Sequence, residues 1–176
     1  MARREIVDGR PWLRLWMEDV RLPNGKVVEN FATLEMPDYT VIVALTLDNQ
    51  VVVERNYKHG ARRVCLNFPA GYLNPGEAPL AGAQRELLEE TGYEAEQWMS
   101  LGSFTGDGNR GCGRGFFFLA RGARRIAEPD SGDLEEMQIG LMPLNDLAQA
   151  LFSGDVAVLG MAAAVGLAFA ALARER

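Results

Sequence analysis

The chain has 176 residues, of which 48% are hydrophobic and 24% charged. These values are typical of one soluble globular domain with enough apolar material for a single core. Its 18 basic and 24 acidic residues give a net charge of −6, which argues against general nucleic-acid binding because that function needs a positive surface. Two cysteines, Cys65 and Cys112, are too few for a disulfide scaffold or a zinc finger.

The ends of the chain bear on its compartment. The charged N-terminus has no apolar run behind it, which predicts no secretory signal, and free cysteines then favour the reducing cytoplasm. Residues 156–172 carry no charge, but their alanine and glycine content is too weakly hydrophobic for a membrane span. We therefore expect a cytoplasmic protein without a membrane partner, whose C-terminal helix packs on its own domain or on a partner subunit.

The first third of the chain predicts β-structure. Residues 12–22 and 26–36 flank Pro23-Asn24-Gly25, which carries an asparagine–glycine hairpin signal. Residues 39–47 are β-branched and almost continuously apolar, as in a strand that is buried on both faces. Residues 51–55 predict the next strand.

Helices and strands alternate irregularly in the rest of the chain. We expect a helix over residues 79–91, since Pro79 suits a first helical turn and Gly92 suits a left-handed cap. The further elements that the pattern predicts are strands at 98–104, 115–120 and 137–143, a short helix at 144–152 and a closing alanine-rich helix. Hairpins mixed with helices favour an α+β or mixed-sheet sandwich over a doubly wound parallel sheet.

Three glutamates of the helix at 79–91 carry the chemistry. At about 100° per residue, Glu86, Glu89 and Glu90 project within a wedge of roughly 100° on one helix face. Carboxylates this close repel one another, and a bound divalent cation would turn the repulsion into coordination. Oxygen ligands favour Mg²⁺ or Mn²⁺ over zinc. Spacing alone leaves open a second interpretation, a solvated acidic helix face.

The segment from Gly71 to Tyr93 contains the pattern Gly-x5-Glu-x7-Arg-Glu-aliphatic-x-Glu-Glu-x-Gly, followed by Tyr93 in place of an aliphatic residue. This string resembles the Nudix box, and the chain is similar to Nudix hydrolases, which cleave nucleoside diphosphates linked to another moiety. The resemblance implies an α+β fold, an α/β/α sandwich with a mixed sheet. We expect one domain, residues 1–176, in which an N-terminal β-hairpin extension (1–38) precedes the Nudix fold and its C-terminal helix (39–176).

The same resemblance implies roles within the box. Glu86, Glu89 and Glu90 match the glutamates that bind divalent metal, and one of these serves as a base in some members. The carbonyl of Ala70 matches a further metal ligand. Catalytic roles are therefore expected for Glu89 and Glu90, and for Arg85, which orients a glutamate by a salt bridge. The supporting positions of the box are Gly71, Glu77 and Gly92.

Sequence outside the box is similar to the ADP-ribose and nucleoside diphosphate sugar pyrophosphatase branch. The resemblance is carried by residues 54–60, which look like an Arg-Gln-Tyr-Arg strand end, and by Phe68-Pro69-Ala70-Gly71. In that branch the N-terminal hairpin is exchanged within a homodimer and helps to line the nucleoside pocket. Asn67 stands where branch members often carry an acidic residue, and the loop at 106–115 has no proline that would select the substrate.

Basic and aromatic residues are the candidates for substrate binding. Arg55 lies at a strand end before the box, and Arg110 lies in a stretch, 108–127, that is rich in arginine and has no acidic residue. Arginines of this kind can hold phosphate groups. Trp16 is our choice for the aromatic that stacks on the base, with Trp12 and Phe31 as open alternatives.

A carboxylate in the loop before the strand at 137–143 matches the general base proposed for ADP-ribose hydrolases. Glu135 is our choice, and Asp133 and Glu136 stay open as alternatives. Together these features predict a homodimeric, Mg²⁺-dependent pyrophosphatase that hydrolyses ADP-ribose or a related nucleoside diphosphate sugar to a nucleoside monophosphate and a sugar phosphate. The alternatives are a hydrolase of GDP-mannose or another linked diphosphate, and a non-catalytic nucleotide-sugar sensor.

Overall fold

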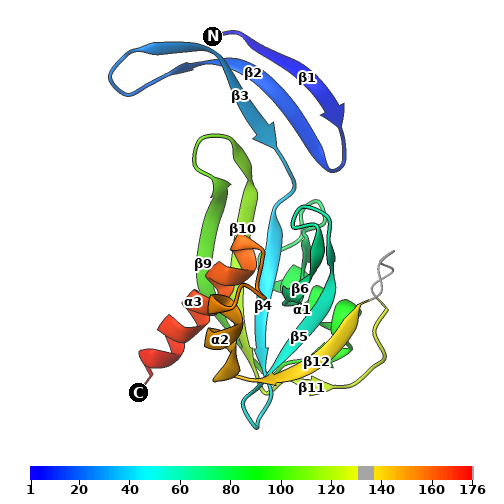
Figure 1. Cartoon of the computed structure of the whole chain (residues 1–176). Coiled ribbons are helices and arrows are strands. Elements are labelled where there is room, and N and C mark those ends of the chain that lie inside the picture. The colour runs from blue at the N-terminus through cyan, green and yellow to red at the C-terminus, as the bar shows by residue number, and fades with distance from the viewer. Residues whose placement is uncertain (131–136, 176) are drawn as a thin grey trace.

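The computed structural model describes residues 1–130 and 137–175, and it confirms the α/β/α sandwich with a mixed sheet (Figure 1). The predicted general-base residues Asp133, Glu135 and Glu136 lie outside the described residues. The strands are β1 (Arg3–Gly9), β2 (Leu13–Arg21), β3 (Val27–Glu35), β4 (Tyr39–Leu45), β5 (Gln50–Lys58), β6 (Arg63–Asn67), β7 (Ala70–Tyr72), β8 (Tyr93–Glu94), β9 (Gln97–Asp107), β10 (Gly111–Arg121), β11 (Arg124–Arg125) and β12 (Gln138–Pro143). The helices are α1 (Pro79–Thr91), α2 (Asp146–Phe152) and α3 (Leu159–Ala173).

The main sheet runs in the order β1-β2-β3-β10-β4-β5-β12, with β6 beside β5, β7 beside β4 and β9 beside β10. It is mixed because β10 is parallel to β4 and to β3, whereas the other pairings are antiparallel. Figure 1 shows α2 and α3 on the near face of the sheet and α1 on the far face. Strands β8 and β11 form a separate two-stranded sheet.

Strand β4 is buried on both faces, as its continuous apolar sequence predicts. Val41, Val43 and Leu45 belong to the core beneath α2 and α3. Ile42 and Ala44 belong to the second core, beneath α1. Because successive side chains of a strand point to opposite faces, a strand between two helical layers needs apolar residues at every position.

Helix α1 has the predicted bounds, 79–91, because each end carries a local signal: Pro79 begins the helix and Gly92 caps its C-terminus. Gly92 adopts a left-handed conformation with φ of 75°, and its backbone N–H donates to the carbonyl of Leu88 at 2.8 Å. A Cβ at this position would lie 2.1 Å from the carbonyl oxygen of Ala127. Glycine is therefore required at position 92 both by the backbone conformation and by the chain that crosses the helix end.

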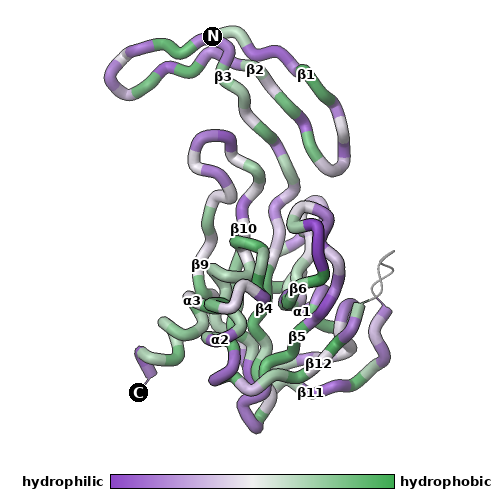
Figure 2. The backbone as a smooth tube through the Cα atoms, in the orientation of Figure 1, coloured by the Kyte–Doolittle hydropathy of each residue, from purple (hydrophilic) through white to green (hydrophobic). Residues whose placement is uncertain are grey.

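The N-terminal strands form an antiparallel meander that extends away from the sandwich (Figure 1). The predicted hairpin is present as β2 and β3, and β1 adds a strand that the sequence analysis did not expect. Figure 2 shows hydrophobic and hydrophilic residues alternating along these strands, whereas hydrophobic residues dominate β4. The N-terminal meander thus has an apolar pattern without a buried core of its own. The division of the domain at residue 38 stays a prediction.

The alanine-rich helix α3 packs on its own domain. Met161, Ala164, Val165 and Ala168 are buried in the core that also contains residues of β4 and β5. In the described part of the chain, no helix combines the length and the apolar character that crossing a membrane would take.

Candidate active site

A cavity of about 620 Å³ lies where the two helical layers meet one end of the sheet. Its volume falls in the range of roughly 300–1,000 Å³ that small-molecule sites occupy. It is lined from α1 by Glu86, Glu89 and Glu90, from the sheet by residues of β4, β5 and β7, and from the start of α3 by Val158, Gly160 and Met161. Trp12, from the loop between β1 and β2, reaches the same cavity.

The three glutamates of α1 share this cavity, as their spacing predicts. Glu86 and Glu90 are each 9% exposed, whereas the side chain of Glu89 is 47% exposed. The backbone N–H of Ala70 donates to Oε2 of Glu90 at 2.7 Å, which joins the start of the box loop to the end of the helix. The structure therefore brings together the four positions predicted to bind metal: Ala70, Glu86, Glu89 and Glu90.

Arg85 binds three of the acidic side chains of the box and lies outside the lining of the cavity. Its Nε and Nη2 donate to the two carboxylate oxygens of Glu77, each at 2.9 Å. Its Nη1 donates to Glu86 at 2.7 Å and to Glu89 at 3.0 Å. Arg85 is not among the described residues that line the cavity. It is placed to orient carboxylates and to offset their mutual repulsion.

The pKa values in this cluster move in opposite directions. The hydrogen bonds from Arg85, and next the backbone N–H of Asn74, lower the pKa of Glu77 to about 2. Burial raises the pKa of Glu86 above its ordinary value, and the contact with Arg85 opposes this shift. Glu77 therefore stays ionised beside Arg85, whereas Glu86 takes up a proton more readily than an exposed glutamate does.

Gly71 makes room for the carboxylate of Glu86. A Cβ on Gly71 would lie 2.2 Å from both the carboxyl carbon and Oε1 of Glu86. Real atoms do not approach this closely, so any side chain at position 71 would displace Glu86. The box glycine thus has a packing reason that the sequence pattern alone does not give.

The donor chemistry of the site fits a hard divalent cation, because three carboxylates line one cavity. In this structure the carboxylates bind protein groups: Glu86 and Glu89 accept from Arg85, and Glu90 accepts from Ala70. No tight group of three or more His, Cys, Asp or Glu side chains that could hold a metal ion occurs within residues 1–130 and 137–175. The role predicted for the Ala70 carbonyl stays a prediction.

The three predicted substrate-binding residues lie elsewhere. Arg55 forms a two-pronged ion pair with Asp155. Trp16 donates from Nε1 to Glu35 at 3.0 Å, and Arg110 lies 3.8 Å from Asp107 near the β9–β10 loop. None of the three belongs to the described residues that line the cavity. Their roles in substrate binding stay predictions.

Lys58 belongs to the basic stretch 54–63, from which sequence reasoning chose Arg55 as the phosphate ligand; Lys58 ends β5 and is the one basic residue among the described residues that line the cavity. A usable signal existed, because side chains alternate along a strand. Val51 and Val53 pack beneath α2 and α3, and Val52 packs beneath α1. Arg55 therefore shares the face of the α2 and α3 layer, and Lys58 shares the face of the glutamate helix.

An aromatic pair also lies at the cavity. The rings of Trp12 and Tyr72 are 5.8 Å apart at a tilt of 48°, and both residues line the cavity. Trp12 is 61% exposed, so its ring has a face left open. Among the aromatic residues considered for base stacking, the geometry favours Trp12. Trp16 is instead covered by Arg3 and Arg14, whose guanidinium carbons lie 4.0 and 4.3 Å from a ring centroid of Trp16.

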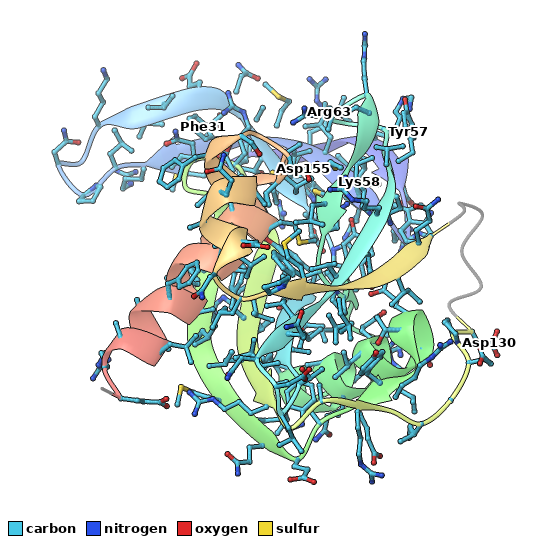
Figure 3. The ribbon with its side chains drawn as sticks, turned by 60° about the horizontal axis from the view of Figure 1, so that its bottom comes forward. Phe31, Tyr57, Lys58, Arg63, Asp130 and Asp155 are labelled. Atoms are coloured by element: carbon cyan, nitrogen blue, oxygen red, sulfur yellow. The ribbon has the colours of Figure 1, made fainter. Side chains whose placement is uncertain are left out.

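The chain passes close to α1 before the segment that contains the predicted general base. The backbone N–H of Asp130 donates to the carbonyl of Glu89 at 2.7 Å. Figure 3 shows Asp130 beside α1, at the last described position before residue 131. Asp130, the residue that precedes the undescribed segment, therefore lies next to α1.

Comparison with known proteins agrees with this geometry. Residues 36–159 match the family model described as the NUDIX domain. The chain is 38% identical over 100 residues to the methanol dehydrogenase activator of Bacillus methanolicus, covering 57% of this chain and 53% of that protein. It is 33% identical over 104 residues to the ADP-ribose pyrophosphatase of Bacillus subtilis (strain 168), covering 59% and 55%. The chain thus spans about half the length of these two relatives.

A solved structure resembles the whole chain. The crystal structure of an ADP compounds hydrolase superposes with a TM-score of 0.83 at 20% identity, covering 99% of this chain and 94% of that one. At this identity the likeness concerns the fold, and it includes the N-terminal meander as well as the sandwich.

Proposed function

The chain belongs to the Nudix family, and on this premise we propose that it is a metal-dependent pyrophosphatase. Its substrate is ADP-ribose or a related nucleoside diphosphate sugar, and its products are a nucleoside monophosphate and a sugar phosphate. The observation that carries the proposal is the gathering of Glu86, Glu89 and Glu90 in one cavity with Lys58. The similarity to an ADP-ribose pyrophosphatase supports the choice of substrate.

The cavity offers separate surfaces for the parts of such a substrate. Lys58 lines the cavity, and its ammonium group would donate hydrogen bonds to a phosphate oxygen of the substrate. The rings of Trp12 and Tyr72 provide a stacking surface for a nucleobase. Val158 and Met161 supply an apolar wall from α3. Binding of the base and the phosphates in one cavity places the linking bond beside the carboxylates of α1.

We propose Mg²⁺ as the cation, with Mn²⁺ as a substitute, held by Glu86, Glu89, Glu90 and the carbonyl of Ala70. When bound, the metal supplies charge neutralisation at the phosphates and lowers the pKa of a coordinated water. Arg85 keeps the carboxylates oriented through its bonds to Glu77 and Glu86.

The proposed general base is Glu135, with Asp133 and Glu136 as alternatives, and it takes the proton of the attacking water. Support for this assignment is the bond of Asp130 to Glu89, which brings the preceding chain to α1. Glu89 and Glu90 are the proposed catalytic carboxylates of the helix itself, because both line the cavity.

We further propose a cytoplasmic homodimer. Support for a second copy comes from the N-terminal meander, on which Ile6, Val7 and Leu13 are exposed. A partner would remove this apolar surface from water. The free cysteines Cys65 and Cys112 agree with a reducing compartment.

A hydrolysis panel tests the proposed function. The purified protein is incubated with Mg²⁺ and ADP-ribose, GDP-mannose, UDP-glucose, NADH, a diadenosine polyphosphate or ATP, and the products are identified by mass. We expect ADP-ribose to give AMP and ribose 5-phosphate faster than the others react. If a different linked diphosphate is cleaved fastest, the protein is a hydrolase with another substrate. If a nucleotide sugar binds tightly and is not cleaved, the protein is a sensor and not an enzyme.

A further inference from the structure

The connection between α2 and α3, residues 153–158, is bound to the β5–β6 hairpin by three separate contacts. Nη1 of Arg55 donates to Oδ1 of Asp155 at 3.1 Å, and Nη2 of Arg55 contacts Oδ2, so the ion pair is two-pronged. The backbone N–H of Leu66 donates to the carbonyl of Asp155 at 3.0 Å. Arg63 donates from Nη2 to the carbonyl of Gly154.

The same connection is anchored on its other side. The N–H groups of Asp155 and Val156 both donate to the carbonyl of Ala150 in α2, at 3.0 and 3.3 Å. Val156 is 6% exposed and belongs to the core beneath α2 and α3. The backbone at 154–156 is therefore fixed between the helix and the hairpin.

The connection leads directly into one wall of the cavity. Val158 ends the connection, and Gly160 and Met161 follow it in α3; all three line the cavity, as does Lys58 from the same β5–β6 hairpin. Figure 3 shows Asp155, Arg63 and Lys58 close together at this end of the molecule. Arg55 and Asp155 are not among the described residues that line the cavity. Their ion pair thus joins two elements that contribute walls, without itself facing the substrate.

We propose that Arg55 and Asp155 form a positioning pair that sets the distance between the α3 wall and the Lys58 side of the cavity, and so tunes substrate affinity. Arg63, through Gly154, supports the same contact. This inference rests on the proposed function for its kinetic readout. It assigns Arg55 a structural partner in place of a phosphate group. Because a guanidinium and a carboxylate in a two-pronged pair fix both distance and direction, the pair suits such a role.

The two possible roles of Arg55 make opposite predictions for Asp155. If Arg55 acts by holding the connection, loss of either partner removes the same contact, so Arg55→Ala and Asp155→Asn raise KM alike, by about three- to tenfold. The double variant is then no worse than the single ones, and kcat stays within about twofold of the wild-type value. If Arg55 binds phosphate directly, Arg55→Ala raises KM whereas Asp155→Asn leaves it unchanged or lowers it, and the proposal is overturned.

Two further variants sharpen the comparison. Arg55→Lys keeps the charge but loses the planar fork, so we expect an intermediate KM. Arg62→Ala removes a guanidinium from the same hairpin that makes no contact with the connection among the described residues, and it should leave KM at the wild-type value. A rise in KM with Arg62→Ala equal to that with Arg55→Ala would indicate a general electrostatic effect and overturn the proposal.

Hydrogen exchange of the ligand-free protein separates this proposal from the proposed function. We expect Arg55→Ala and Asp155→Asn to speed amide exchange in peptides that cover residues 153–161, with peptides of α1 unchanged. Unchanged exchange in residues 153–161 would overturn the positioning role whatever the kinetics show. If the wild-type protein cleaves none of the panel substrates, the proposed function fails, and the exchange result still decides whether the pair holds the wall.

Discussion

Gly71 and Glu86 are packed so closely that position 71 has no space for a methyl group: a Cβ there would lie 2.2 Å from the carboxylate of Glu86. The strand that enters the box and the helix that carries the glutamates are thus brought together at a single point. Nη1 of Arg85 donates to Oε1 of the same carboxylate at 2.7 Å. The position of the Glu86 carboxylate therefore depends on the absence of a side chain at Gly71 and on the hydrogen bond from Arg85.

Replacement of this glycine should impair catalysis more than stability. In Gly71→Ala the methyl group displaces the Glu86 carboxylate, and a misplaced site residue of this kind costs on the order of 10²-fold in kcat/KM. Steady-state kinetics and the thermal midpoint are measured together. Gly60→Ala is the matched control, because a Cβ at Gly60 has nothing within 4 Å. Wild-type activity in Gly71→Ala would contradict the argument.

The bond between Arg85 and Glu77 should make stability depend on pH. The pKa of Glu77 falls from 4.5 to about 2 in the folded protein, so on acidification the unfolded chain takes up the proton first. The stabilisation by ionised Glu77 is therefore fully present above about pH 4.5 and is lost as the pH falls towards about 2. We expect Glu77→Gln to lower the denaturation midpoint at pH 7 and to lower it progressively less between pH 4.5 and 2.

Denaturant unfolding at several pH values checks this expectation. Glu29→Gln, at an exposed position of β3, is the control, and its midpoint should follow the wild type throughout. A difference between the wild type and Glu77→Gln that stays constant from neutral to acidic pH would show that the carboxylate is not stabilised by Arg85.

Lys58 and Arg110 can be compared directly as candidate phosphate ligands. Lys58 lines the cavity from the end of β5, whereas Arg110 lies 3.8 Å from Asp107 in the β9–β10 loop. We expect Lys58→Ala to raise KM about tenfold, the effect of losing one charge-assisted hydrogen bond, and Arg110→Ala to leave KM unchanged. The reverse order of effects would restore the original prediction for Arg110 and remove Lys58 from the site.

Trp12 and Trp16 allow a similar test for the nucleobase. Because the ring of Trp12 lies at the cavity, Trp12→Ala should raise KM for a nucleoside diphosphate sugar by about tenfold, in line with the loss of one stacked base. Trp16 is occupied by Arg3 and Arg14, so Trp16→Ala should leave KM unchanged. An unaltered KM in Trp12→Ala would mean that the base binds elsewhere.

The sequence allowed accurate prediction where the deciding interactions are local. Pro79 and Gly92 define α1, and the spacing of Glu86, Glu89 and Glu90 places them on one face whatever surrounds the helix. The burial of β4 on both faces follows equally from its unbroken apolar run. Each of these inferences needs only neighbours within a few residues along the chain.

The substrate side of the cavity depends on contacts between distant segments, and there the sequence was insufficient. Arg55 looks like a phosphate ligand until its partner Asp155, one hundred residues later, is known. Trp12 reaches the cavity because the β1–β2 loop comes close to β7, where it meets Tyr72. Strand β1 was not predicted because its sequence is largely charged and lacks the alternation of apolar and polar residues that identifies strands.

Removal of the metal should abolish hydrolysis without unfolding the protein. The carboxylates of Glu86 and Glu90 are held by Arg85 and Ala70 when no metal is bound, so the chain has internal partners for them. We expect a chelator to stop hydrolysis and excess Mg²⁺ to restore it, while added Mg²⁺ raises the thermal midpoint through binding to the folded state.

A variant of one carboxylate tests the same cation site. Glu90→Gln should lower kcat about 10²-fold or more at saturating Mg²⁺, and added Mg²⁺ should raise its thermal midpoint less than that of the wild type. Hydrolysis that persists in the chelator, or in Glu90→Gln at the wild-type rate, would mean that these carboxylates do not bind a catalytic cation.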